Sequence, residues 1–229
     1  MIPKKIHYCW YGGKRKSKLI LKCIDSWKRF FPDYEIIEWN ESNTDLHENA
    51  YLEQAYNEKK WAFVSDYVRM KVLYEHGGIY FDTDVQVLKV FPEEILSLPA
   101  FTGFESFSLK VSPGLVFGCV RGFKLAGMMV ESYYMDSFQN EGVDKIKTIN
   151  MRITDILVDN GLKICDTKQT IMDLTIFPSS KFCAYDGKRR RIDIKEDTLS
   201  IHHYTASWLP WYRKIRLFFG TILRRIIYR

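Results

Sequence analysis

Hydrophobic and polar positions near the start of the chain follow two different periods. Residues 5–11 (KIHYCWY) alternate loosely and end at a pair of glycines, which predicts a strand followed by a loop. In residues 17–30 apolar side chains recur every three or four positions and Pro32 follows, as is typical of a helix. Residues 34–39 (YEIIEW) predict a second strand. This order of strand, helix and strand predicts an α/β fold with a sheet of parallel strands.

The rest of the chain continues in the same way. Residues 61–75 predict a helix that Gly77 and Gly78 end, and residues 77–88 (GGIYFDTDVQVL) predict the next strand. Further helices are expected at 48–57, 123–138 and 150–160, and further strands at 100–104, 114–119 and near 163, 175 and 199–204. Because the chain has no internal repeat and no low-complexity linker, we expect residues 1–209 to form a single domain.

The end of the chain has a different character. From residue 213 onward there are six basic residues and no acidic one. On a helical wheel one apolar stripe forms, made of Ile215, Phe218, Phe219, Ile222, Leu223 and Ile226. Its apolar runs are shorter than the roughly 20 residues that span a bilayer. Residues 210–229 therefore predict a basic amphipathic helix on an anionic membrane surface, with a helix packed on the protein's own core as the alternative.

Composition limits the classes of protein that fit. Without the six basic residues of the tail, 28 of the 34 remain against 28 acidic residues, so the body is neutral, which argues against a nucleic-acid enzyme. The start of the chain lacks the apolar segment of a signal peptide, so a mature cytosolic protein is expected. The five cysteines are odd in number and scattered, which favours reduced core thiols over disulfides or a thiolate zinc site.

Two carboxylates interrupt the apolar run of residues 77–88. In a continuous strand Asp82 and Asp84 would project to the same side, with Cα atoms about 6.6 Å apart. They would repel each other unless a cation lay between them. Mg²⁺ and Mn²⁺ prefer oxygen ligands and often bind one or two carboxylates together with substrate phosphates. The pair therefore indicates a metal site that neutralises a diphosphate, although D-x-D also occurs by chance in solvated turns.

Charged and aromatic residues elsewhere support a site. On a helical wheel Asp66 and Arg69 fall away from the solvent side of their predicted helix, so a buried functional pair is favoured over a surface ion pair. The stretch SIHHYTASW (200–208) offers imidazoles for a metal and an indole for a base or sugar, although each histidine could have a structural role. Trp10 is either a core aromatic or a stacking platform before flexible glycines.

Four ordered motifs carry a resemblance to a known family. They are W-x-G-G (10–13), S-D-x-x-R (65–69), G-G-x-Y-x-D-x-D (77–84) and H-H-Y-x-x-S-W (202–208). Together they resemble the DXD glycosyltransferases of capsular polysaccharide synthesis and the yeast Och-type mannosyltransferases, grouped as glycosyltransferase family 32. They are similar more distantly to the glucosyltransferase domains of large clostridial toxins.

The resemblance implies a GT-A fold that binds a nucleotide sugar and a role for each matching residue. Asp82 would contact both ribose and metal, Asp84 would ligate the metal directly, and His203 would be a further metal ligand, although His202 and His203 cannot be told apart from the sequence. Asp66 and Arg69 would hold the sugar and its phosphates. The donor contacts implied for the remaining residues are base stacking by Trp10, a nucleotide pocket lined by Asn40 and Tyr80, and a diphosphate cover formed by Ser207 and Trp208.

The resemblance implies a retaining glycosyltransferase, and the D-x-D carboxylates favour dependence on Mn²⁺ or Mg²⁺. It would transfer a hexose from a nucleoside diphosphate sugar, UDP-linked by preference, to a surface glycan such as capsular polysaccharide or a lipid-linked oligosaccharide. Asp66, Arg69, Asp82 and Asp84 would form the catalytic group. The amphipathic tail would place the enzyme on the inner face of the cell membrane, with no nucleic-acid partner.

Two other classes of protein share part of this pattern. A phosphohydrolase of the haloacid dehalogenase type also has an apolar strand followed by D-x-D. Its motif has Thr or Val two residues after the second Asp, where this chain has Gln86. A non-catalytic carbohydrate-binding or membrane-binding module would explain the tail and leave the charged residues of the predicted site without a role. An EF-hand is excluded, because the sixth position from Asp82 is Val87 and not glycine.

Overall fold

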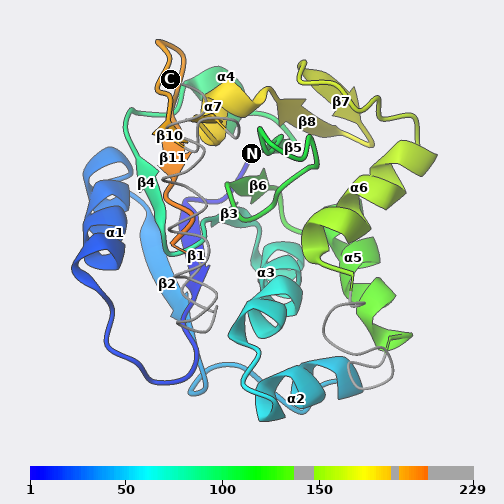
Figure 1. The fold of residues 1–229 in the computed structure, drawn as a ribbon. Coiled ribbons are helices and arrows are strands. Elements are labelled where there is room, and N and C mark those ends of the chain that lie inside the picture. Colours follow the sequence, from blue (N-terminus) through cyan, green and yellow to red (C-terminus); the bar gives the residue numbers. More distant parts are fainter. Residues whose placement is uncertain (137–146, 187–190, 206–229) are drawn as a thin grey trace, which may run out of the picture.

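The computed structural model describes residues 1–136, 147–186 and 191–205, and its centre is a seven-stranded mixed sheet (Figure 1). The strand order is β2-β1-β3-β6-β5-β8-β7, with β1 Lys5–Cys9, β2 Glu35–Trp39, β3 Gly78–Tyr80, β5 Ala100–Gly103, β6 Phe117–Cys119, β7 Gln169–Ile171 and β8 Leu174–Phe177. Strands β1, β2, β3, β5 and β8 run in one direction, and β6 and β7 run in the other. Two small ladders pair β4 (Val85–Val87) with β11 (Ser200–His202) and β9 (Tyr185–Asp186) with β10 (Arg191–Ile192).

Helices cover both faces of the sheet and enclose two apolar cores. The helices are α1 Lys18–Phe30, α2 Ala50–Asn57, α3 Trp61–His76, α4 Glu93–Leu96, α5 Lys124–Tyr134, α6 Ile149–Asp159 and α7 Ser179–Phe182. Helices α2, α3, α5 and α6 pack on one face, and α1, α4 and α7 pack on the other (Figure 1). Burying one apolar face of the sheet against each helix layer is the usual solution for an α/β domain. The α/β class predicted from the sequence is therefore confirmed.

Helix α1 fixes the strand that follows the two aspartates. Trp27 is completely buried, and its indole Nε1 donates to the carbonyl of Val85 at 2.8 Å. The amide of Val87 donates to the Ser26 hydroxyl at 3.0 Å. A buried polar group that loses its partner costs about 1–3 kcal/mol, so these two bonds hold β4 in one place against α1. The turn that precedes β4 is thereby held in position as well.

The prediction of a single strand over residues 77–88 is wrong. The chain forms β3, then a turn, then β4, and the turn contains Asp82 and Asp84. Asp82 donates its amide to the Gly114 carbonyl at 3.0 Å and accepts from the Val85 amide at 2.9 Å, which closes the turn. Strand alternation therefore does not determine which way the two carboxylates point.

Most of the other predicted elements are confirmed within a few residues. Helices over 17–30, 48–57, 61–75 and 150–160 correspond to α1, α2, α3 and α6. No strand forms near 163, where the chain instead continues to β7, and the short elements α4, α7, β9 and β10 were not predicted. Gly77 ends α3 at φ 62°, and a Cβ there would lie 2.6 Å from the Arg121 amide, so the glycine is required.

Some predictions concern parts of the chain that the structure does not describe. The predicted helix over 210–229, Ser207 and Trp208 lie outside the described residues, as does the end of the predicted helix over 123–138. Among the helices of the described ranges, none combines the length and the apolar character needed to cross a membrane. All five cysteines are free and four of them are buried, as expected for reduced core thiols.

A buried histidine links β1 to the end of α3. His7 has no exposed surface, and its Nδ1 accepts a hydrogen bond from the Trp39 indole at 3.1 Å. Because an indole nitrogen only donates, Nε2 of His7 carries the proton and donates to the Gly77 carbonyl at 2.9 Å. Burial lowers the pKa of His7 to about 4. A second proton, on Nδ1, would point at the Trp39 indole N–H and break that hydrogen bond.

We expect His7 to make the folded state sensitive to acid. Its pKa is lowered on folding from 6.5 to about 4, so the unfolded chain binds the extra proton between these values and stability falls as pH decreases through this window. The total loss is on the order of 3 kcal/mol. Urea unfolding at pH 7 and pH 4.5 should show a smaller loss for His7→Gln than for the wild type. An equal loss in both proteins would contradict this role.

Candidate functional site

The candidate site lies at the edge of the sheet where the parallel strands end. Trp10 follows β1, Asn40 follows β2, Asp82 follows β3, and Glu105 comes shortly after β5. Because β1, β2, β3 and β5 run in the same direction, these residues share one edge of the sheet. In open α/β sheets, ligands bind outside the carboxyl ends of the strands. The topology therefore brings together residues that lie up to 95 positions apart in the sequence.

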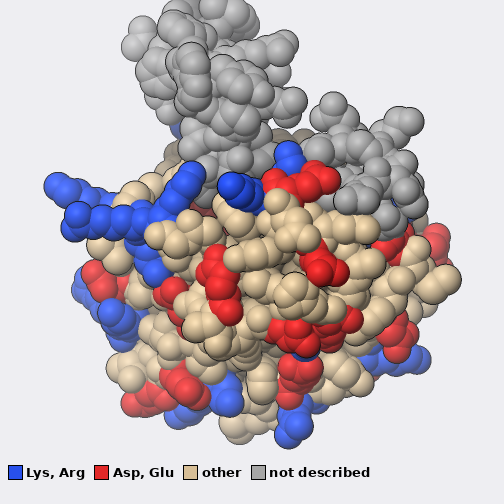
Figure 2. All heavy atoms as spheres, turned by 90° about the horizontal axis from the view of Figure 1, so that it is seen from below, with Lys and Arg blue, Asp and Glu red and all other residues tan. Residues whose placement is uncertain are grey.

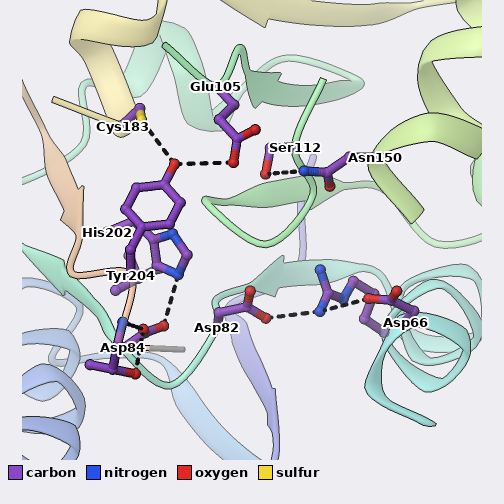
Figure 3. A network of polar contacts seen from close by, with 12 residues as sticks. Asp66, Asp82, Asp84, Glu105, Ser112, Asn150, Cys183, His202 and Tyr204 are labelled. Atoms are coloured by element: carbon purple, nitrogen blue, oxygen red, sulfur yellow. Dashed lines mark hydrogen bonds and ion pairs between the residues drawn. The ribbon is translucent and has the colours of Figure 1, made fainter. Parts of the chain in front are cut away.

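A buried arginine connects two of the predicted catalytic carboxylates. The Nη2 atom of Arg69 lies 2.9 Å from Oδ1 of Asp82 and 3.3 Å from Oδ1 of Asp66 (Figure 3). Its guanidinium also stacks 4.7 Å from the centre of the Tyr80 ring. Only 4% of Arg69 is exposed, so the predicted inward orientation of Asp66 and Arg69 is confirmed.

Asp66 has a second partner at the start of another helix. Its Oδ2 accepts a hydrogen bond from the amide of Ile149, the first residue of α6, at 3.4 Å. Burial raises the pKa of Asp66 to about 6, although Arg69 opposes this shift. A helix N-terminus and a guanidinium both favour the ionised carboxylate. Asp66 thus joins α3, α6 and the Asp82 turn around one buried group of charges.

Asp84 is held by residues from the far end of the described chain. Its Oδ1 lies 2.8 Å from Nε2 of His202, and its Oδ2 accepts from the amide and hydroxyl of Thr205 at 2.9 and 2.8 Å (Figure 3). Burial opposes ionisation, but the His202 and Thr205 contacts hold the pKa of Asp84 well below its usual range. Asp84 therefore remains a carboxylate across the physiological pH range.

The two neighbouring histidines, His202 and His203, have different hydrogen-bond partners. The His202 ring contacts Asp84, whereas Nε2 of His203 lies 3.1 Å from the Gln86 side chain. Although burial disfavours a charged ring, nearby carboxylates led by Asp84 raise the pKa of His202. Its Nδ1 is buried and has no hydrogen-bond partner within the described residues. His202, rather than the His203 chosen from the sequence, thus lies against Asp84, and the metal role of His203 stays a prediction.

A glycine allows Asp82 to approach the neighbouring chain closely. A Cβ at Gly114 would lie 2.2 Å from Oδ2 of Asp82 and 3.1 Å from Nη1 of Arg69. The carboxylate thus fits against bare backbone, and any side chain at position 114 would displace it. The pKa of Asp82 is raised by burial and lowered by Arg69 and His202, with a net upward shift. Asp82 and Asp84 therefore differ in pKa: it is raised for Asp82 and lowered for Asp84.

Several residues that the sequence analysis did not select also face this region. Tyr204 packs its ring 4.1 Å from that of His202, and its hydroxyl lies 3.3 Å from Glu105 and 3.1 Å from Cys183 (Figure 3). Burial raises the pKa of Glu105. Thr205, Gly114 and the Ser112–Asn150 pair at 3.1 Å were also missed. An acidic residue directly after a predicted strand was the one sequence signal that could have indicated Glu105.

The other predicted donor-binding residues that the structure describes, Trp10, Asn40 and Tyr80, lie at this edge in different surroundings. Tyr80 is buried beneath Arg69. Asn40 is part of the turn after β2, where it bonds to Glu38 and Ser42. The Trp10 indole donates to the Lys14 carbonyl at 2.7 Å. Their contacts with a nucleotide stay predictions.

The described acidic and histidine side chains do not by themselves form a complete metal site. Within the ranges that the structure describes, no group of three or more His, Cys, Asp or Glu residues is arranged to hold a metal ion. Two carboxylates with substrate phosphates would suffice for Mg²⁺ or Mn²⁺, which usually keep several non-protein ligands.

Comparisons with known proteins agree with the motifs of the sequence. Residues 17–102 match the family model described as "Glycosyltransferase sugar-binding region containing DXD motif". This range contains Asp66, Arg69 and both aspartates of the turn. The resemblance to DXD glycosyltransferases is therefore confirmed.

Curated relatives match over part of their length. The Schizosaccharomyces pombe protein "Inositol phosphoceramide mannosyltransferase 3" is 30% identical over 133 residues, which are 53% of this chain and 33% of the relative. The Legionella pneumophila protein "Subversion of eukaryotic traffic protein A" is 26% identical over 121 residues, 41% of this chain and 19% of the relative. This chain thus spans a third or less of the length of these relatives.

A solved structure supports the fold. "PaToxG Glycosyltransferase" superposes with a TM-score of 0.54 at 22% identity, covering 69% of each chain. The GT-A fold expected from the resemblance is confirmed by this likeness and the sheet described above.

We expect removal of Arg69 to destabilise the folded state strongly. Replacing Arg69 with Met leaves Asp66 and Asp82 without their shared cation, and breaking a buried ion pair in this way costs about 3–5 kcal/mol. The loss should be larger at pH 8 than at pH 5, because an unpaired Asp66 has a raised pKa and is relieved by taking up a proton. Urea unfolding at both pH values measures the effect.

A matched control lies on the same helix. Lys71 pairs with Glu48 and Glu75 nearer the surface, so Lys71→Met should cost less than about 1 kcal/mol. In Arg69→Met with Asp66→Asn, the total loss should be smaller than the sum of the single losses. Two results would contradict a buried charge group. One is a loss of stability in Arg69→Met no larger than that in Lys71→Met, and the other is additive losses for Arg69→Met and Asp66→Asn.

Proposed function

We propose that this chain is a glycosyltransferase that uses the Asp82–Asp84 turn to bind the diphosphate of a nucleotide sugar together with a divalent cation. Its matched DXD region and GT-A fold support glycosyl transfer as the class of reaction. The name of the S. pombe relative, which describes a mannosyltransferase, supports a hexose as the transferred group.

The observation that carries the proposal is that Asp82 and Asp84, two residues apart, are held by different partners. Asp84 is kept ionised by His202 and Thr205, and Asp82 is oriented by Arg69 at the end of β3. Both lie where α/β folds bind nucleotides. A solvated D-x-D turn would need neither the buried guanidinium nor the contacts from β11.

The side chains present fit a hard divalent cation. Asp84 and Asp82 would supply oxygen ligands, and His202 would orient Asp84 through Nε2 without binding the ion itself. When bound, Mn²⁺ or Mg²⁺ would neutralise charge on the diphosphate and so improve it as a leaving group.

The protein's own residues would position the two carboxylates and the substrates and stabilise the charge that develops on the diphosphate. Arg69 and Asp66 fix Asp82, and Thr205 fixes Asp84, so the carboxylates need no rearrangement as charge develops on the diphosphate. Arg69 adds positive charge close to the turn. Holding donor and acceptor in the attack geometry can account for much of the rate without a protein nucleophile.

Several finer features rest on the family resemblance alone. They are UDP as the donor nucleotide, retention of the anomeric configuration, Mn²⁺ as the preferred metal, and capsular polysaccharide or a lipid-linked oligosaccharide as the acceptor. Direct contacts of Trp10, Asn40, Tyr80, Ser207 and Trp208 with the donor belong to the same set. The membrane location predicted for residues 210–229 also remains part of the proposal.

A nucleotide-sugar screen tests the reaction class. With Mn²⁺ present, the wild type should release a nucleoside diphosphate from at least one UDP-linked or GDP-linked hexose, and chelation should stop the release. Asp84→Ala should reduce the rate at least about 100-fold, because it removes the carboxylate that stays ionised. Release of inorganic phosphate from simple phosphate esters, with no nucleoside diphosphate, would instead identify a phosphohydrolase.

The two histidines provide a matched pair of variants. His202→Ala should weaken Mn²⁺-dependent turnover about tenfold or more, because it removes the ring beside Asp84. His203→Ala should stay within about threefold of the wild type, since that ring bonds to Gln86. Turnover measured over a range of Mn²⁺ concentrations checks this. The reverse ranking would restore the assignment of His203 made from the sequence.

A further inference from the structure

We propose that a basic face formed by Lys14, Arg15, Lys18 and Lys22 binds the surface of an anionic membrane beside the candidate site. These residues lie in the loop after β1 and on the first turns of α1, and all four are exposed. None of these four residues belongs to the catalytic proposal or to residues 210–229. Its test therefore does not depend on glycosyl transfer.

The basic face lies close to the edge of the sheet that carries the site. The loop that bears it begins at the end of β1, which pairs in parallel with β3, the strand leading to Asp82. The Trp10 indole bonds to the Lys14 carbonyl, and the Lys16 ammonium lies 5.3 Å from the Trp10 ring, so the loop is attached to that edge. Viewed from below in Figure 2, basic side chains gather on the side of the molecule where α1 lies in Figure 1.

The positive charge of this region is locally uncompensated. Residues 14–29 contain seven basic residues and one acidic residue, in a body that is otherwise balanced. Lys16 pairs with Glu38 at 2.7 Å, and Lys28 pairs with Asp25 at 3.5 Å. In the described part of the chain, no ion pair involves any of the four residues of the basic face.

Two acidic residues that contact the loop of residues 10–17, Glu38 and Glu41, already have partners. Besides Lys16, Glu38 accepts a hydrogen bond from the Tyr8 hydroxyl at 2.5 Å. Glu41 accepts from the Gly12 amide at 2.6 Å. An ordinary solvated face usually mixes both signs of charge, whereas here the neighbouring carboxylates are turned to other groups. The field in front of the basic face therefore favours an anionic partner.

An exposed leucine favours a bilayer over a soluble polyanion. Leu21 is 46% exposed and lies between Lys18 and Lys22 in the sequence of α1. Basic side chains around an apolar one suit the boundary between lipid head groups and acyl chains, where both can be satisfied. A polysaccharide or nucleic acid would gain little from the leucine. Each Lys or Arg near an anionic leaflet strengthens binding roughly fivefold, so four of them form a substantial contact.

Docking through this face would turn the edge of the sheet toward the membrane. An acceptor carried on a lipid could then reach the Asp82–Asp84 turn without leaving the bilayer. The amphipathic tail predicted from the sequence would give a second contact, and stable peripheral binding generally requires two signals.

Co-sedimentation of the full-length chain with vesicles tests the proposal. The vesicles contain phosphatidylcholine with about one-third phosphatidylglycerol, at about 0.1 M salt, and pure phosphatidylcholine vesicles serve as reference. Lys18→Glu combined with Lys22→Glu should reduce partition onto the anionic vesicles at least about tenfold. Lys18 is the first residue of α1, where an acidic side chain is favourable, and Lys22 is exposed on the second turn, so this variant should fold. Circular dichroism and the unfolding midpoint verify that it does.

A second double variant controls for total charge. Lys163→Glu combined with Lys168→Glu changes the net charge equally, near β7 at the far edge of the sheet from β1 and β2. Its partition should stay within about twofold of the wild type. Equal losses in both double variants, no loss in the α1 variant, or no binding by the wild type would overturn the proposal.

Leu21→Ser distinguishes the bilayer from other polyanions. This variant should weaken vesicle binding about threefold or more and leave binding to heparin unchanged. Unchanged vesicle binding would overturn the membrane assignment and favour a soluble polyanion.

Discussion

The buried guanidinium of Arg69 is the interaction on which the candidate site depends. It lies between Asp66 and Asp82, almost without exposure, and above the Tyr80 ring. Taking three charged groups out of water is costly unless each is paired, and well-packed apolar residues would often serve stability as well or better. The arrangement is therefore better explained by a need to orient Asp82 than by a need to hold α3 in place.

The other half of the site comes from the far end of the described chain. Strand β11 pairs with β4 and brings His202 and Thr205 onto Asp84, while Trp27 and Ser26 of α1 hold β4 from the opposite side. The turn between β3 and β4 is thus fixed at both ends, by Arg69 on Asp82 and by β11 on Asp84. Such support is what a site needs if its carboxylates are to meet a diphosphate without first rearranging.

The sequence allowed much of this fold to be predicted because its periodic signals are strong. The spacing of apolar residues and Pro32 defined α1, and Gly77 marked the end of α3. The burial of Asp66 and Arg69 could be predicted from a helical wheel, because it depends only on local geometry.

Long-range contacts account for what could not be predicted. The strand pattern over 77–88 concealed a turn, because the bond from the Asp82 amide to Gly114 depends on a residue 32 positions away. The choice of His202 over His203 beside Asp84 depends on the register of β11 against β4, which no local pattern encodes. Glu105 and Tyr204 meet for the same reason, from loops about 100 residues apart.

The most direct measurement of the central claim is anomalous diffraction at the manganese edge from crystals of the protein soaked with Mn²⁺ and UDP. We expect a single strong peak about 2.1–2.2 Å from a carboxylate oxygen of Asp84, with the diphosphate bound to the same ion and Asp82 still paired with Arg69. A manganese peak and a diphosphate bound elsewhere, with the Asp82–Asp84 turn making no contact with either, would contradict the account.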